Sequence, residues 1–311
     1  GKMLVRVNKM KAIYRAEVDR TNRIGVGLTG IHEFAWNIFG CTFQDLIAAY
    51  EWAFMDGPNP PKKVQDFWLF LARMRDALEQ EVGDYAESLG MSRPHTYATI
   101  KPSGTISKIL SCTEGAHLPA VLYYIRWIVF PKDGAKHKEY ESRGYPVKDI
   151  SYQYHGCVVV GFPTKQPIVD IIPPELISTA EDVGPEAHFK WLRLLEWFWL
   201  GGDGRNNQVS YTLKYNPNEV SFNDFMSIIL EYQPHVKCCS VMPVVDLSAY
   251  AYVPEEKVSQ EQYEQLKAQI DRAVVEDYDD SAVECEGGVC PIEGRQNGDV
   301  VAEFMNGGAA E

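Results

Sequence analysis

The sequence changes character most sharply between Ala98 and Pro119, a stretch that reads ATIKPSGTISKILSCTEGAHLP. A short apolar, β-branched run ends at a Lys-Pro pair, and apolar residues then resume at helical spacing from Ile106. Proline gives up a backbone donor where a helix start can spare it, and the nearby glycine permits a tight turn. The stretch therefore predicts a strand, a tight turn and the start of a helix.

This predicted turn carries the groups that hold a phosphate. The free N–H groups from Gly104 to Ser107, with three hydroxyls beside them, suit a phosphate on the positive end of a helix dipole. An ordinary helix with Ser103 as its N-cap is the alternative, because Ser and Thr open many helices that bind nothing. The candidate binding residues are Pro102, Ser103, Gly104, Thr105, Ile106 and Ser107.

Composition limits the class of protein. The chain has 311 residues, 45% of them apolar and 23% charged, which is typical of a globular protein with a sizeable core. A net charge of −13 argues against a nucleic-acid groove, which needs a basic stripe. No run approaches the roughly 18 apolar residues of a membrane span, and no signal peptide is recognisable. Seven cysteines, an odd number, favour free thiols in a reducing compartment, so we expect a cytoplasmic protein.

The periodicity of apolar residues predicts alternating helices and strands. Strands that alternate with helices imply parallel pairing through crossovers, so the expected fold class is α/β. Helices are expected at residues 28–39, 42–54, 64–89, 138–144, 186–200, 221–232 and 255–270, and strands at 98–100, 123–130, 157–162, 207–212 and 236–242.

A formal G-x-G-x-x-G pattern lies at Gly25, Gly27 and Gly30. A dinucleotide-binding fold needs a buried strand immediately before the first glycine, but residues 18–23 are almost wholly polar. We therefore reject an NAD-dependent oxidoreductase and interpret these glycines as allowing close packing of the helix at 28–39.

The last region, residues 276–311, holds ten Asp or Glu and one Arg with few large apolar residues, so we expect it to be disordered. Cys285 and Cys290 lie in it, joined by a segment whose Gly-Gly pair lets a disulfide close without strain. Zinc is the alternative, but it normally needs four ligands, and this region holds no His and no further Cys. We predict a mobile redox dithiol at Cys285 and Cys290, and no metal site.

Two parts of the central stretch, Lys101–Ser107 and Gly115–Pro119, together closely resemble the substrate-phosphate loop of ribonucleotide reductases. The resemblance is nearest to the coenzyme B12-dependent class II enzymes of the monomeric triphosphate-reductase type. It runs from about Arg20 to Ile292. Further segments that fall in the family's order are Tyr123–Arg126, Gly144–Val147, Asn207–Ser210 and the Cys285/Cys290 pair.

The resemblance implies a ten-stranded α/β barrel of the ribonucleotide reductase and glycyl-radical type, of which this chain holds the second half. Residues 1–250 would form the C-terminal half-barrel of the catalytic domain, residues 251–275 a charged helical extension, and residues 276–311 a flexible acidic tail with the redox cysteine pair. The implied cofactor is adenosylcobalamin. Because the chain begins at Gly1 rather than Met, we expect a fragment or a processed piece.

The resemblance also implies the chemistry. A thiyl radical on a finger-loop cysteine abstracts the ribose 3′ hydrogen, two further thiols reduce the 2′ carbon, and the tail dithiol re-reduces the resulting disulfide with electrons from a thioredoxin-like reductant. The finger-loop pattern Asn-x-Cys-x-Glu is absent from the 311 residues. We therefore expect the chain to need the N-terminal half of the reductase, on another chain or missing from this one. The remaining cysteines are interpreted as small buried apolar residues: Cys41, Cys112, Cys157, Cys238 and Cys239.

Other interpretations stay open beside the class II reductase. Class I enzymes relay a radical through two adjacent tyrosines on a late barrel strand, and our placement of that strand at 236–242 has Cys238 and Cys239 instead. A class I large-subunit fragment is nevertheless an alternative. So is a non-catalytic nucleotide-phosphate-binding or interaction module, although such a module has no use for Cys285 and Cys290.

Overall fold

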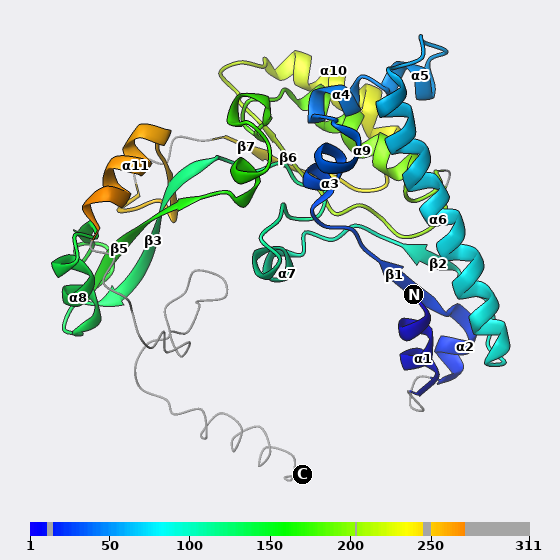
Figure 1. Cartoon of the computed structure of the whole chain (residues 1–311), viewed down its shortest axis with the longest axis horizontal. Helices are drawn as coiled ribbons and strands as arrows, with labels where there is room; N and C mark the ends of the chain where they lie inside the picture. Colours follow the sequence, from blue (N-terminus) through cyan, green and yellow to red (C-terminus); the bar gives the residue numbers. More distant parts are fainter. Residues whose placement is uncertain (11–14, 203, 245–249, 271–311) are drawn as a thin grey trace, which may run out of the picture. The chain divides into compact units, whose positions relative to one another are not determined.

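The computed structural model describes residues 1–10, 15–202, 204–244 and 250–270 (Figure 1). The predicted tail with Cys285 and Cys290 lies outside the described residues. The chain divides into two compact units, which we describe separately. Among the described residues, the first unit comprises Gly1–Ile125 and Pro163–Tyr263, and the second comprises Arg126–Phe162 and Glu264–Ile270.

Parallel strand pairs form the framework of the first unit. Strand β1 (Arg23–Val26) pairs in parallel with β2 (Thr96–Ala98), and β6 (Thr212–Tyr215) pairs in parallel with β7 (Ser240–Pro243). An isolated parallel bridge links the two two-stranded sheets, between Ile100, just beyond the end of β2, and Val209, just before the start of β6. This parallel pairing confirms the expected α/β organisation for the first unit.

Helices fill the connections between these strands (Figure 1). The long helix α6 runs back along the array toward β2, and α9 and α10 precede β6 and β7. The helices of this unit are α1 (Lys2–Met10), α2 (Arg15–Thr21), α3 (Ile31–Phe39), α4 (Phe43–Ile47), α5 (Tyr50–Phe54), α6 (Lys62–Ser88), α7 (Gly104–Ile109), α9 (Pro185–Phe198) and α10 (Phe222–Tyr232), with 3₁₀ turns at Pro167–Asp170, Pro174–Leu176 and Gln233–His235.

Tryptophans dominate the core between helices and strands. Trp68, Trp191 and Trp199 are among the largest fully buried side chains. A buried indole N–H needs an acceptor. Trp68 donates to the carbonyl of Leu46 at 3.1 Å, and Trp199 donates to the carbonyl of Thr99 at 2.9 Å. The core is thus apolar, and the indole N–H groups of these two buried tryptophans have hydrogen-bond acceptors.

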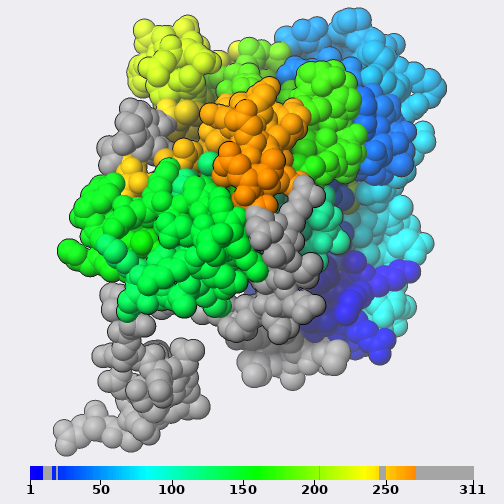
Figure 2. Space-filling model, turned by 60° about the vertical axis from the view of Figure 1, so that its left-hand side comes forward, coloured from blue at the N-terminus to red at the C-terminus, as the bar shows by residue number. Residues whose placement is uncertain are grey.

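A four-stranded sheet has the order β4-β5-β3-β8. Within it β4 pairs with β5 in antiparallel fashion, Val147 opposite Val160. Helix α11 is charged and exposed apart from Tyr263 and Leu266, and Figure 2 shows it in orange at the surface. The elements are β3 (Tyr123–Pro131), β4 (Val147–Asp149), β5 (Cys157–Lys165), β8 (Glu255–Lys257), α8 (Lys136–Ser142) and α11 (Gln260–Gln269).

Several expectations need correction. The pairing of β4 with β5 is antiparallel, because the two strands are joined by a short connection rather than a helical crossover. The helix expected at 42–54 is two short helices, and the one expected at 255–270 is a strand followed by α11. The strand expected at 207–212 begins only at Thr212, although the bridge at Val209 lies within that range.

The glycine pattern is a further correction. Strand β1 runs through Gly25 rather than ending before it. A Cβ on Gly25 would lie 2.9 Å from Cγ2 of Thr99, so this glycine admits the neighbouring strand segment and not the helix that follows. The glycine at the start of α3 is Gly30, which has a φ of 69°.

Candidate phosphate-binding loop

The predicted phosphate-binding residues form the tip of a loop that leaves the end of β2. Pro102 and Gly104–Ile106 are exposed, Ser103 is half-buried, and Ser107 is buried. Helix α7 begins at Gly104, as expected from the sequence. The first N–H groups of a helix have no acceptor within it, so α7 itself does not use those of Gly104–Ile106.

Ser103 and Ser107 shape the turn. Ser103 occupies the N-cap position with a left-handed φ of 58°, but its side chain does not cap the helix. Its Oγ lies 3.4 Å from the carbonyl of Lys101, which is a weak contact. Ser107 donates its hydroxyl to the carbonyl of Gly104 at 3.2 Å, inside the turn. The ordinary N-cap alternative therefore lacks its defining hydrogen bond. Ser103 stands at the N-cap position in a left-handed backbone conformation instead.

The two limbs of the loop meet at a neck. Gly115 has a φ of 53°, and a Cβ built on it would lie 2.1 Å from the carbonyl oxygen of Lys101. Only glycine fits such an approach. The segment Cys112–Pro119, called here the return limb, leads from this neck back into the core.

The return limb is fastened to α9 and its surroundings. Trp191 on α9 donates its indole N–H to the carbonyl of Ala116 at 2.8 Å. The backbone N–H of Ala180 donates to the carbonyl of Pro119 at 2.9 Å. An exposed tip thus stands on a limb whose backbone is bonded inside the core.

The limb is fastened on its other side to the segment between β1 and α3. Thr113 donates its N–H and its hydroxyl to the carboxylate of Glu33, at 2.7 and 2.6 Å. The carbonyl of Thr113 accepts from the Gly30 N–H at 3.0 Å and the Thr29 hydroxyl at 2.8 Å. The N–H of Gly115 donates to the Thr29 hydroxyl at 3.2 Å. Sequence reasoning missed these anchors, because no local pattern links residues some eighty positions apart.

Three imidazoles and a phenol lie beneath the loop. His117 stacks on Tyr211 with ring centroids 5.0 Å apart, and its Nε2 accepts the backbone N–H of Thr212 at 3.1 Å. Nδ1 of His188 lies 2.6 Å from the hydroxyl of Tyr211. Burial lowers the pKa of His188 to about 4 and also lowers the pKa of His117. Both imidazoles are therefore neutral near pH 7 and serve as hydrogen-bonding groups rather than cations.

His32, which precedes Glu33 on α3, is buried in the same region. Its ring stacks on Trp191 with centroids 5.2 Å apart. Burial lowers its pKa to about 4, so it is also neutral near pH 7. His32 thus adds an aromatic contact between α3 and α9.

The cysteines differ from the expectation that all are small buried residues. Cys41 is buried, whereas Cys112, Cys157 and Cys239 are half-buried and Cys238 is exposed. Burial raises the pKa of Cys239 to about 11 and that of Cys41 to about 11, which disfavours their thiolates. Among the described residues, no group of three or more His, Cys, Asp or Glu side chains could hold a metal ion.

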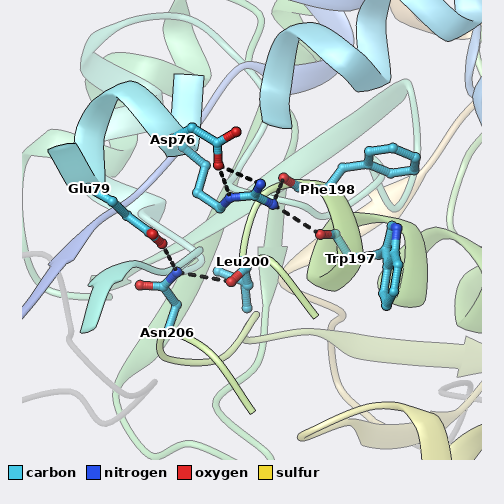
Figure 3. A network of polar contacts seen from close by, with 7 residues as sticks. Asp76, Glu79, Trp197, Phe198, Leu200 and Asn206 are labelled. Atoms are coloured by element: carbon cyan, nitrogen blue, oxygen red, sulfur yellow. Dashed lines mark hydrogen bonds and ion pairs between the residues drawn. The ribbon is translucent and has the colours of Figure 1, made fainter. Parts of the chain in front are cut away.

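A polar network lies at the other end of the strands (Figure 3). Asn206 donates to Glu79 Oε1 at 2.8 Å and to the carbonyl of Leu200 at 2.9 Å, while its own Oδ1 accepts the N–H of Tyr97 in β2. Arg75 on α6 donates to the carbonyl of Phe198 at 2.9 Å. This network ties α6 and the end of α9 to the beginning of the strand that leads to the loop.

Asn207, from the third segment that resembled the reductases, continues this fastening. Its amide nitrogen donates to the carbonyl of Ile24 at 2.8 Å and to that of Ala98 at 3.0 Å. One side chain therefore bridges β1 and β2. The role of this segment in the described structure is to hold strands together.

A pocket of about 260 Å³ opens near this network. Glu196 is 4% exposed, and both of its oxygens accept the backbone N–H of Lys237, at 3.2 and 3.0 Å. Burial raises the pKa of Glu196 to about 7. The pocket is lined by Phe54, Arg193, Glu196, Trp197, Gly202, Gly204, Pro234, His235, Val236 and Lys237.

Comparison with known proteins places this geometry in context. No family model matches the chain. Adenosylcobalamin-dependent ribonucleoside-triphosphate reductases from Lacticaseibacillus paracasei and Levilactobacillus brevis are each 26% identical to it, over 302 and 298 residues, with 90% of the chain covered. The chain is a homologue of these reductases. A putative reductase of the same name from Mycobacterium phage D29 is 26% identical over 290 residues.

The chain spans 38% of the length of these relatives. A crystal structure of a B12-dependent class II ribonucleotide reductase matches 83% of the chain and 35% of the solved protein, with a TM-score of 0.63 and 23% identity. The mixed α/β fold is therefore shared with class II reductases, and the resemblance inferred from the loop motif is confirmed. Within the described part of the chain, no helix is long and apolar enough to cross a membrane.

Proposed function

We propose that this chain is part of an adenosylcobalamin-dependent ribonucleoside-triphosphate reductase and binds the phosphates of the substrate ribonucleotide. The complete reductase converts ribonucleotides to 2′-deoxyribonucleotides. The observation that carries the proposal is the tip Pro102–Ser107, which is exposed at Pro102 and at Gly104–Ile106 and stands on a return limb bonded into the core. A phosphate needs N–H groups that the helix does not use, on a preorganised backbone, and this tip supplies them.

The cofactor belongs to the complete reductase in this proposal. Adenosylcobalamin would supply the initiating radical when bound. The pocket at Glu196, at about 260 Å³, is too small for a corrin ring, and its one buried carboxylate is no corrin ligand set. In this proposal the described residues Pro102–Ser107 bind the substrate phosphates rather than the cofactor.

The part that we propose for each segment of the chain follows from the family resemblance. Residues 1–250 would form the C-terminal half of a ten-stranded barrel, residues 251–275 an extension, and residues 276–311 the tail. The N-terminal part of the reductase would supply the thiyl-radical cysteine. Cys285 and Cys290 would return two electrons to a barrel disulfide and become a disulfide themselves, which a thioredoxin-like protein then reduces. A reducing compartment such as the cytoplasm suits this cycle.

Substitution of Gly104 tests the phosphate loop. A Cβ at Gly104 would lie 3.9 Å from Glu114, its nearest neighbour, so the fold accommodates Gly104→Val while the added methyl groups block a ligand at the backbone. We expect the complete reductase with this change to lose nucleotide affinity because the ligand is blocked, and Thr105→Ala to lose roughly ten-fold or more through one charge-assisted hydrogen bond of about 1.5–3 kcal/mol. Equilibrium binding of a ribonucleoside triphosphate measures both.

Gly184→Val is the matched control. Gly184 is exposed at the start of α9, and a Cβ there would meet nothing within 4 Å. Its substitution should leave nucleotide affinity unchanged. Wild-type affinity in the Gly104→Val protein would refute the assignment of this loop.

A further inference from the structure

The segment Gly27–Glu33, called here the latch, has no part in the function proposed so far. It contains the last two glycines of the G-x-G-x-x-G pattern, and it connects β1 to α3. Its polar groups bond to the return limb of the phosphate loop. The pattern that suggested a dinucleotide site thus lies against a different binding element.

Residues of the latch form hydrogen bonds with the N–H, the hydroxyl and the carbonyl of Thr113. The N–H and hydroxyl of Thr113 both donate to Glu33, and its carbonyl accepts from Thr29 and Gly30. Thr29 also accepts the N–H of Gly115 at the neck of the loop. Three residues of the latch therefore fix both the position and the orientation of Thr113 in the return limb.

The latch is itself firmly placed. Glu33 is 6% exposed and Thr113 is 8% exposed, so water does not compete for these bonds. Hydrogen bonds to a carboxylate are shorter and stronger than those between neutral groups. Ile31 and Ala35 on either side of Glu33 belong to the main core, which fixes the helix that carries the carboxylate.

The tip, in contrast, has few attachments of its own. Its N–H groups lie between the end of β2 and the return limb, and the backbone N–H of Cys112 donates to Ser107 at 3.0 Å. A shift of the limb at Thr113 would therefore move the tip with it. Misplacement of a binding group by about 1 Å is enough to cost a hundred-fold in a preorganised site.

We propose that Glu33 and Thr29 are positioning residues that hold the phosphate loop in its binding conformation through Thr113 and Gly115. This inference rests on the proposed function. It assigns the role of a phosphate-affinity determinant to residues that do not touch the ligand. The affinity for the phosphates should therefore depend on the latch, whereas the affinity for the base and ribose should not.

The test compares a ribonucleoside triphosphate, the corresponding nucleoside and inorganic triphosphate as ligands of the complete reductase. In Glu33→Ala we expect the Kd of both triphosphate ligands to rise by about ten-fold to a hundred-fold, with the nucleoside Kd unchanged. Glu33→Gln keeps one acceptor oxygen and should fall between. KM should rise with kcat nearly unchanged, because the lost interaction is made equally in ground and transition states.

Controls separate positioning from general damage. Glu196→Gln removes an equally buried carboxylate of the first unit far along the strands, and it should leave all three Kd values unchanged. Should Glu33→Ala fail to fold, Thr29→Val removes the hydroxyl contacts to Thr113, Gly115 and Cys112 with almost no change of shape and is expected to show the same phosphate-specific loss. Should neither fold, the latch is a structural element only and the inference is wrong.

The remaining outcomes are also decisive. Unchanged triphosphate Kd in a folded Glu33→Ala or Thr29→Val protein overturns the inference, as does an equal loss for the nucleoside. A wild-type reductase that binds the triphosphate no more tightly than the nucleoside contradicts the proposed function instead.

Discussion

Two glutamates with side chains buried in the first unit are held in different ways. Glu33 receives one directed donor at each oxygen, both from Thr113. Among the described residues, the backbone N–H of Lys237 is the one hydrogen-bond donor to both oxygens of Glu196, and burial raises its pKa to about 7. Burial alone therefore does not decide what a carboxylate does, because the number and direction of its donors matter as much.

The raised pKa of Glu196 predicts a pH-dependent stability. Between its ordinary pKa of 4.5 and about 7, the folded protein binds more protons at this site than the unfolded chain, so stability falls as pH rises through that window. Glu196→Gln lacks this slope. We expect the variant to gain on the order of 2–3 kcal/mol relative to wild type between about pH 4.5 and pH 8.

Urea unfolding of both proteins across this pH range measures the difference. Other titrating groups are common to the two proteins and cancel. Parallel stability curves would show that Glu196 is ionised in the folded state without cost.

Elements that carry their own signal could be placed from the sequence. Helix α6 follows from its apolar stripe, and α10 follows from Ser221, whose hydroxyl accepts the N–H of Asp224 as an N-cap. Strand β5 follows from its run of β-branched residues. The short strands β1, β4 and β8 could not be predicted from the sequence, because a segment of three or four residues becomes a strand only by pairing with a distant segment.

The same distinction applies to the candidate site. The turn at Ser103 and Gly104 is encoded locally and could be recognised. The bonds of Thr113 to Glu33 and of Ala116 to Trp191 join positions far apart in the chain, so only the fold brings them together. The left-handed conformation of Ser103 was also not predictable, since serine ordinarily caps a helix in extended form.

Strand β7 predicts how the isolated chain behaves. All four of its residues are exposed, and Val241 and Met242 are large and apolar. An unpaired apolar strand edge is a template for association. We expect the chain expressed alone to self-associate and to bind a hydrophobic dye, and Val241→Lys to reduce both, as followed by light scattering and dye fluorescence.

Leu230→Lys serves as comparison for this edge. Leu230 is 72% exposed on α10 and Val241 is 42% exposed, so the change at Leu230 removes more apolar surface without charging a strand. Equal effects of the two substitutions would indicate nonspecific hydrophobic association rather than pairing at the strand edge. A monodisperse, active wild-type chain would contradict the view that it needs the rest of the reductase.

For the molecule as a whole, the chain spans 38% of its relatives' length, and the reaction proposed for the complete reductase would need residues outside this chain. The predicted dithiol offers the sharpest test of its catalytic role. In the complete, pre-reduced enzyme, Cys285→Ser with Cys290→Ser should leave one turnover intact, because the barrel thiols still hold one electron pair. Thioredoxin-driven multiple turnover should stop, and dithiothreitol should restore it by reducing the barrel disulfide directly.

Cys157→Ser, a half-buried thiol of the second unit, is the control and should change neither rate. Folding damage with equal loss under both reductants would indicate a structural pair. Full thioredoxin-driven turnover in the double variant would exclude a shuttle. A wild-type enzyme that binds nucleotide but never turns over would favour the non-catalytic module.

The parallel array also has a consequence for the order of assembly. Arg23 pairs with Thr96, and Thr212 pairs with Ser240, but the bridge of Ile100 to Val209 closes the longest stretch of chain. Closing a longer loop costs more entropy, and non-local pairing is slow. We therefore expect two strand pairs to form separately and to join last at Ile100. The phosphate loop starts at the residue after Ile100. Partly folded chains would therefore not bind nucleotide until the bridge between Ile100 and Val209 has formed.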